Sequence, residues 1–152
     1  MVRSLCYIVL IMMPFIACKT TPKIVEVKKG FDFVDSESLT EIIDQARAEN
    51  KLIFVDFYTD WCLPCKLMDS DVFTDKNVID FFKEHFVSYK VDSEKGGGPN
   101  LSFLYSVKSY PTLLFLDING RILQRKEGAA YQTELMKLAR TALELNDVNA
   151  AN

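Results

Sequence analysis

Cys62 and Cys65 stand two residues apart, with Leu63 and Pro64 between them. Two thiols at this spacing can form a disulfide and exchange it with other disulfides, or they can supply two of the four ligands of a structural zinc site. Beyond residue 18, the only further cysteine or histidine is His85, which is distant in the sequence. The pair therefore favours redox chemistry over metal binding.

The position of the pair suits thiol exchange, because it follows a buried run and is expected to open a helix. A thiolate is the nucleophile, and the first turn of a helix lowers a cysteine pKa from about 8.5 to near 7 or below. Cys62 is expected to hold that position. Cys65, one turn later, is close enough to resolve a mixed disulfide between Cys62 and a substrate. Pro64 fits the first turn because no N–H partner is needed there.

The run before the pair predicts a central strand. Residues Leu52–Tyr58 are apolar, β-branched or aromatic except for Asp56, which is typical of a strand buried on both faces. Ahead of it, Ser38 and Glu41 form a candidate capping box for a helix that continues to Asn50.

Four helices and three strands are expected after Cys62. We expect a helix from Cys62, a helix capped by Thr74 or Asp75, a strand over Phe86–Val91 and a short helix over Asn100–Tyr105. A strand over Pro111–Asp117 should then turn through Asn119-Gly120 into a hairpin strand over Arg121–Gln124. The chain should end in a helix whose inward-facing residues are Leu135, Leu138, Ala139, Ala142 and Leu145. This order predicts an α/β domain over residues 31–147 with a mixed sheet of four or five strands, followed by a tail at 148–152.

Gly96, Gly97 and Gly98 predict a flexible loop between the Phe86–Val91 strand and the short helix. No Lys-Ser or Lys-Thr follows them, so they are not a phosphate-binding loop. We assign this loop no chemistry.

Length and charge narrow the function further. The chain of 152 residues is 49% hydrophobic and suits one globular domain, which we expect to be monomeric. A net charge of −3 argues against a nucleic-acid surface, which would need clustered lysines and arginines.

The N-terminal residues resemble an export signal. Arg3 is followed by an uncharged run, Leu5–Ala17, which is too short to span a membrane and contains Pro14. Residues 15–18 end in Cys18 and resemble the lipobox of bacterial lipoproteins. We therefore expect a signal peptide at 1–17, a lipid on Cys18, a tether at 18–30 and a periplasmic, membrane-anchored protein. The alternatives are a leader cut elsewhere and a short anchor.

Two motifs carry a family resemblance that covers residues 31–145. The stretch Val55–Lys66, which contains Trp61-Cys62-Leu63-Pro64-Cys65, resembles the active-site segment of thioredoxin, and Tyr110-Pro111-Thr112 resembles its cis-proline loop. Met68, Phe73, Asp75, Val78 and residues 117–120 are more similar to the soluble periplasmic domain of the membrane thiol reductase family. The resemblance implies the thioredoxin fold.

The resemblance also implies roles for residues around the cysteines. Asp56 would accept a proton from Cys65 through water; the alternative is a carboxylate that reaches solvent at a strand edge. Pro111 would be cis and would place the Tyr110 backbone beside Cys62, where an extended substrate segment pairs; the alternative is a trans proline that starts a strand. Trp61 would flank the site, although a tryptophan can also serve packing alone.

These observations predict an exported, lipid-anchored oxidoreductase without a cofactor that reduces disulfides in proteins. Its partners would be disulfide-containing proteins and, as electron donor, a membrane thiol reductase, because an exported reductase works in an oxidising compartment. The alternatives are a disulfide oxidase or isomerase, and a zinc-binding or redox-silent adaptor. Oxidants of this family tend to carry a histidine between the cysteines, whereas this chain has Leu63 and Pro64.

Overall fold

The computed structural model describes residues 30–36 and 38–151. The predicted signal peptide, the predicted lipid site Cys18 and most of the predicted tether lie outside the described residues and remain predictions. Within the described residues, no helix combines the length and the apolar composition needed to cross a membrane.

The described residues form five strands and five helices. In order they are β1 (Phe33–Val34), α1 (Leu39–Glu49), β2 (Leu52–Tyr58), α2 (Leu63–Asp71), α3 (Lys76–His85), β3 (Phe86–Asp92), α4 (Gly98–Leu104), β4 (Thr112–Leu116), β5 (Ile122–Glu127) and α5 (Gln132–Ala150). The predicted α/β class and the expected order of elements after β1 are confirmed.

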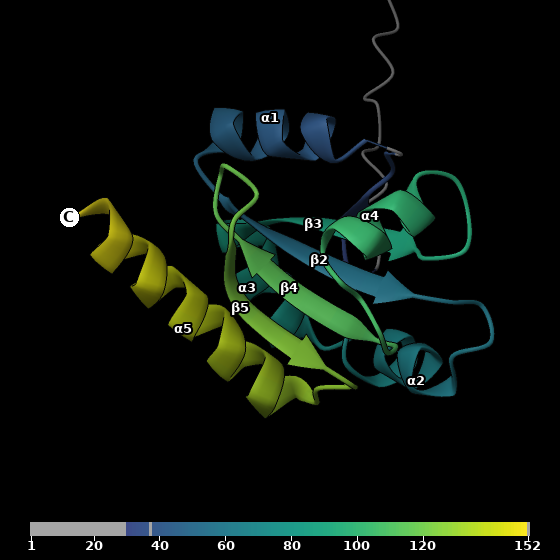
Figure 1. Ribbon diagram of the computed structural model, residues 1–152. Helices are drawn as coiled ribbons and strands as arrows, with labels where there is room; N and C mark the ends of the chain where they lie inside the picture. Colours follow the sequence, from purple (N-terminus) through teal and green to yellow (C-terminus); the bar gives the residue numbers. More distant parts are fainter. Residues whose placement is uncertain (1–29, 37, 152) are drawn as a thin grey trace, which may run out of the picture.

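The strands form one mixed sheet in the order β1-β3-β2-β4-β5, with β2 in the centre as predicted. β2 runs parallel to β3, with Asp56 opposite Lys90, and antiparallel to β4, with Asp56 opposite Leu113. β2 and β3 end at the same edge of the sheet, beside α2 and α4 (Figure 1). The residues that follow β2 in the sequence therefore lie at that edge.

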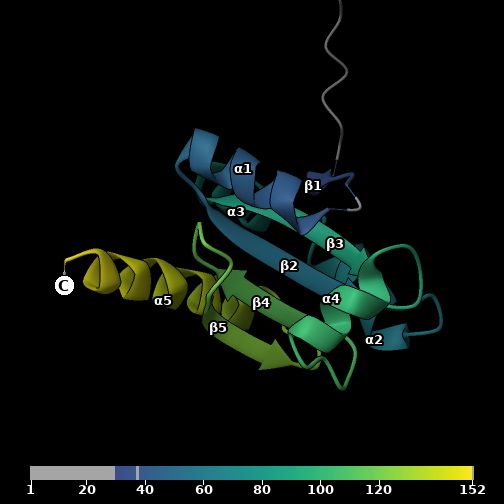
Figure 2. The same ribbon diagram turned by 45° about the horizontal axis from the view of Figure 1, so that its top comes forward.

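Two hydrophobic cores lie on opposite faces of the sheet because alternate strand residues point to opposite sides. One core joins Phe54 and Phe115 to α2, α3 and α5, and the other joins Val55 and Leu114 to α1 and α4. Figure 2 shows α1 and α4 along the same face. The first core is rich in phenylalanine, and Phe54 packs edge-on against Phe82 at 4.9 Å between ring centroids. Burial on both faces explains the almost continuous apolar run of β2.

The start of α1 differs from the sequence-based prediction. Ser38 occupies the N-cap position, but its side chain accepts no hydrogen bond from the helix, so the predicted capping box is wrong. Ser36 takes over part of that role, because its hydroxyl donates to Glu41 Oε2 at 2.7 Å and accepts from the Ser38 N–H at 3.0 Å. The local sequence contains two serines, and tertiary contacts decide which one is used.

Other boundaries also differ from the predictions. α4 begins at Gly98 rather than at Asn100 because Pro99 fits its first turn. α5 continues to Ala150, so part of the predicted tail at 148–152 is helical. Leu145, which was expected to face inward, is exposed. β1 adds an edge strand of two residues that the sequence pattern did not reveal.

Candidate active site

β2 delivers the cysteine pair to the sheet edge, and α2 begins at the pair. Cys62 is the N-cap residue of α2 and Pro64 lies in the first turn, as expected. Cys62 and Cys65 form a disulfide with an S–S distance of 1.97 Å and a Cα–Cα distance of 5.4 Å. The Cys65 N–H donates to Cys62 Sγ at 3.2 Å, so this sulfur receives one of the unpaired donors at the helix start. The arrangement suits a sulfur that carries negative charge in the reduced protein.

The Tyr110–Pro111 peptide bond is cis, in agreement with the expectation from the resemblance. Hydrogen bonds fix the loop around it: Thr112 Oγ1 donates to the Ser109 carbonyl at 2.7 Å, and the Gly128 N–H donates to the Pro111 carbonyl at 2.8 Å. Tyr110 of this loop contacts the Trp61 ring edge-on, with ring centroids 5.8 Å apart. The segment before Cys62 and the cis-proline loop are therefore neighbours.

Asp56 lies fully buried in the centre of β2, which excludes the alternative of a solvent-exposed strand edge. Lys90 Nζ lies 3.5 Å from Asp56 Oδ2, and neither Asp56 oxygen has a hydrogen-bond donor among the described residues. Burial raises the pKa of Asp56 to about 6, whereas the positive charge of Lys90 opposes this rise and the negative charge of Asp69 adds to it. Asp56 is thus able to gain or lose a proton near neutral pH.

Lys90 links the buried carboxylate to helix α2. Its ammonium is bound by Asp69 and also lies over the rings of Phe33, Tyr58 and Phe73, at 4.9 to 5.5 Å from their centroids. These contacts hold the ammonium beneath α2, with one carboxylate on each side.

α2 places Asp69 one turn after Cys65, and residues four apart share one face of a helix. Because Asp69 binds Lys90 and Lys90 contacts Asp56, the face of α2 that carries Cys65 is directed toward the Asp56 side of the sheet. Cys65 and Asp56 are both about 1% exposed. A thiol-bearing residue and a carboxylate are thus both buried on the side of the sheet that α2 covers.

The rim around the disulfide is apolar and open. Trp61 is 66% exposed and Leu63 is 65% exposed, so large apolar side chains lie in solvent on both sides of Cys62 in the sequence. Trp61 donates its indole N–H to Glu94 Oε1 at 3.0 Å. Packing in the core is therefore excluded for Trp61, whereas its predicted part in substrate binding stays a prediction.

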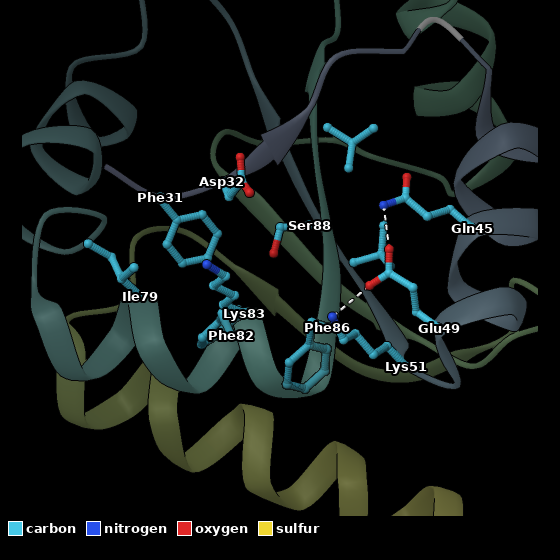
Figure 3. A pocket seen from close by; sticks show the side chains of 12 residues that line it. Phe31, Asp32, Gln45, Glu49, Lys51, Ile79, Phe82, Lys83, Phe86 and Ser88 are labelled. Atoms are coloured by element: carbon cyan, nitrogen blue, oxygen red, sulfur yellow. Dashed lines mark hydrogen bonds and ion pairs between the residues drawn. The ribbon is translucent and has the colours of Figure 1, made fainter. Parts of the chain in front are cut away.

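A separate cavity of about 170 Å³ lies at the other end of β3, beside Phe86 (Figure 3). On its wall, Glu49 accepts hydrogen bonds from Lys51 Nζ at 2.6 Å and from Gln45 Nε2 at 2.8 Å, and these contacts lower the pKa of Glu49. The cavity is remote from the disulfide. Among the described residues, no group of three histidine, cysteine or acidic side chains is arranged to hold a metal ion.

Comparison with known proteins identifies the family. The family described as a thioredoxin-like domain matches residues 39–143. This chain belongs to the thioredoxin-like family. A solution structure of a proposed disulphide isomerase from Bacteroides thetaiotaomicron has 42% sequence identity and a TM-score of 0.68, over 76% of this chain and 95% of that one. The predicted thioredoxin fold is thereby confirmed.

Two curated thioredoxin-like relatives match shorter stretches. Thioredoxin-1 of Drosophila melanogaster is 40% identical over 49% of this chain and 65% of its own length. The thiol:disulfide interchange protein DsbD of Pseudoalteromonas atlantica is 33% identical over 50% of this chain, but this match spans only 13% of that protein. The predicted similarity to thiol:disulfide interchange proteins is confirmed. The chain is a thioredoxin-like thiol:disulfide oxidoreductase with a Cys62–Cys65 disulfide.

Sequence reasoning assigned no role to three residues that the thioredoxin-like fold brings to the site. Lys90 could have been suspected because it is the one basic residue of an apolar strand, but its position opposite Asp56 depends on strand register. Asp69 and Glu94 lie on polar surfaces and give no signal in the sequence. Their contacts arise only when α2 and the loop after β3 are folded against the sheet.

Proposed function

We propose that this protein is an exported, lipid-anchored thioredoxin-like reductase that transfers electrons from a Cys62/Cys65 dithiol to disulfides in proteins. One observation carries the proposal: the cysteine pair closes a disulfide at the start of α2, next to a cis-proline loop. The apolar, exposed rim formed by Trp61 and Leu63 supports a protein substrate rather than a small polar one.

The reaction balances with the groups of this site. The Cys62 thiolate attacks one sulfur of the substrate disulfide, a mixed disulfide forms, and the other substrate sulfur leaves as a thiolate. Cys65 then loses its proton and attacks Cys62 Sγ, so the mixed disulfide breaks and the second substrate thiol is released. Two electrons have moved to the substrate, and Cys62 and Cys65 are left as the disulfide. Asp56 receives the Cys65 proton through water, because its pKa of about 6 allows it to be charged and then protonated near neutral pH.

The cis-proline loop supplies the place where the substrate binds. Tyr110 and Pro111 would pair through their backbone with an extended segment that carries the reacting cysteine. Pro64 keeps the first turn of α2 in a fixed geometry, so that Cys62 is presented to this segment.

The decisive activity test is insulin reduction by the wild-type protein, Cys62→Ser and Cys65→Ser. We expect Cys62→Ser to be inactive and Cys65→Ser to accumulate substrates bound to Cys62, since the resolving thiol is missing. Proteins trapped on Cys65→Ser in cells would identify the partners. A wild-type protein that reduces no disulfide and binds zinc once reduced would instead support the adaptor alternative.

The direction of exchange is a separate question, because the relative from Bacteroides thetaiotaomicron is described as a proposed isomerase. Trp61 is the only tryptophan and adjoins Cys62, so its fluorescence can follow the dithiol–disulfide equilibrium in a glutathione or dithiothreitol buffer. With no histidine between the cysteines, we expect a potential nearer the roughly −270 mV of thioredoxin than the roughly −120 mV of DsbA. A value more positive than about −180 mV would favour the isomerase or oxidase alternative.

The lipid anchor is tested by Cys18→Ala. The wild-type protein should partition with membranes through more than one acyl chain at Cys18, since a single chain anchors a protein only weakly. The variant should be soluble or uncleaved. If the variant is cleaved correctly and still partitions with membranes, the lipoprotein proposal is wrong. Electrons for an exported reductase would come from a membrane thiol reductase. Capture of the proteins that form mixed disulfides with Cys62 or Cys65 variants would identify this donor.

A further inference from the structure

The loop between β3 and α4, residues 93–97, is folded tightly against the active-site segment. The Ser93 N–H donates to the Tyr58 carbonyl at 2.9 Å, so the loop leaves β3 directly beside the end of β2. Gly98 then lies so close to the end of β3 that a Cβ atom there would be 1.8 Å from the Asp92 carbonyl oxygen. The glycine run therefore allows close packing, although the sequence alone predicted only a flexible loop.

Side-chain contacts fix Glu94 within this loop. Its N–H donates to Asp92 Oδ1 at 3.0 Å, and the next residue, Lys95, forms ion pairs with Asp92 at 2.9 Å and with Asp60. Asp60 immediately precedes Trp61. The loop is thus attached to the active-site segment at two neighbouring points, once through Lys95 and once through Glu94.

Trp61 needs such an attachment because most of its ring is in solvent. An exposed side chain changes rotamer freely on the nanosecond timescale unless contacts restrict it. The ring makes a hydrogen bond to Glu94 at 3.0 Å and an edge-on contact with Tyr110 at 5.8 Å between ring centroids. The ring is thus held between the loop after β3, which carries Glu94, and the cis-proline loop, which carries Tyr110.

We propose that Glu94 is a positioning residue for disulfide exchange, which holds the Trp61 indole against Tyr110 so that the two contacting rings form one wall of the path by which a protein segment reaches Cys62. The inference rests on the proposed function and adds to it that the loop after β3 determines the shape of the substrate entrance. Glu94 itself does not touch the reacting sulfur atoms in this proposal. It acts through Trp61.

Two substitutions separate this role from a general structural one. Glu94→Ala removes the acceptor for the indole N–H, whereas Glu94→Gln keeps a side-chain carbonyl oxygen that accepts the same hydrogen bond. Glu144→Ala is the matched control, because Glu144 is an exposed glutamate on α5, outside the site. All variants are made in the full chain.

The first measurement is the fluorescence of Trp61, the only tryptophan of the chain. In Glu94→Ala we expect a lower anisotropy and stronger quenching by acrylamide, because the ring is no longer held. Glu94→Gln and Glu144→Ala should match the wild-type protein. Thermal unfolding midpoints should be the same for all variants, since Glu94 is exposed.

The second measurement is the reduction of insulin and of a small aromatic disulfide, dithiobis(nitrobenzoate). For Glu94→Ala we expect the KM for insulin to rise about three- to tenfold, the effect of one lost hydrogen bond, with kcat within about twofold. Reduction of the small disulfide should be unchanged, because it has no extended segment to be guided. Glu94→Gln should restore the insulin KM.

Three results would overturn the inference while leaving the proposed function intact: unchanged Trp61 fluorescence in Glu94→Ala, altered fluorescence with an unchanged insulin KM, or Glu94→Gln as impaired as Glu94→Ala. A wild-type protein that reduces neither substrate would overturn the proposed function, and the inference with it.

Discussion

The ammonium of Lys90 lies 3.5 Å from the carboxylate of Asp56, in the interior of the domain beneath α2. A buried carboxylate loses hydration, and one ammonium shared with Asp69 replaces only part of it. Asp56 is therefore costly to keep charged, and its protonation affects both stability and the proposed chemistry.

Replacing Asp56 with asparagine should stabilise the oxidised protein at pH 7. The pKa of Asp56 is raised from 3.8 to about 6, so between these values the folded protein binds more protons than the unfolded chain, and its stability falls as the pH rises. Above pH 6 this destabilisation is complete and amounts to about 3 kcal/mol. Asp56→Asn removes it at pH 7 and changes little at pH 4.

Urea unfolding of the oxidised wild-type protein and of Asp56→Asn, at pH 4 and at pH 7, measures this effect. The difference between the two proteins should grow by about 2 to 3 kcal/mol between those pH values. A difference that does not depend on pH would contradict the raised pKa. The same variant should slow insulin reduction if Asp56 accepts the Cys65 proton.

Replacing Asp69 with asparagine should lower the pKa of Asp56. The negative charge of Asp69 raises that pKa, and without it the positive charge of Lys90 acts on Asp56 alone. The carboxyl carbon shift of Asp56, followed by NMR as a function of pH, reports the change directly. Asp71→Asn, an exposed change two residues along the same helix, should leave the titration as in the wild-type protein.

Gly98→Ala should destabilise the domain by about 3 kcal/mol, the upper range for overpacking, because the new Cβ atom would meet the Asp92 carbonyl oxygen at 1.8 Å. Gly30→Ala is the control: no atom lies within 4 Å of its added Cβ, and we expect less than about 0.5 kcal/mol. Chemical denaturation of both variants provides the comparison. Equal stability of the two would show that α4 does not pack on the end of β3 as described.

Alkylation of the reduced protein at pH 7 should label Cys62 before Cys65. Cys62 caps α2 and its sulfur accepts the Cys65 N–H, which favours the reactive thiolate, whereas Cys65 lies one turn inside the helix. Both residues are almost completely buried, at 3% and 1% exposed, so the expected difference rests on the thiolate character of Cys62. Mass spectrometry after short exposure to iodoacetamide locates the label. Faster labelling of Cys65 would reverse the proposed roles of the two thiols.

The sequence reveals most of the fold and the reacting atoms, because both depend on local pattern. The apolar run of β2 marks the central strand, and the Cys62–Cys65 spacing after it marks the site. The sequence does not reveal contacts that depend on register or on packing between distant segments. The Asp56–Lys90 pair requires the alignment of two parallel strands, and the Trp61–Glu94 hydrogen bond requires a loop that folds back on the site.

Helix ends were also hard to predict, for a related reason. Ser36 and Ser38 offer similar local chemistry for the start of α1, and the choice depends on the path of the chain toward β1. α5 continues past Leu145 although its apolar side is no longer covered there. The helix continues beyond the last residue whose side chain is buried, and a pattern of apolar residues in the sequence reveals only the buried part.

The central place of β2 in the sheet has a consequence for how the chain is made. Both strands that pair with β2 follow it in the sequence, so β2 leaves the ribosome with no hydrogen-bonding neighbour on either side. One side of β2 stays without a hydrogen-bonding partner until β3 has been synthesised to Asp92, and the other side until β4 has been synthesised to Leu116. Leu52–Tyr58 is therefore the segment that a holding chaperone would bind on a nascent chain, and the segment through which unfinished copies would aggregate.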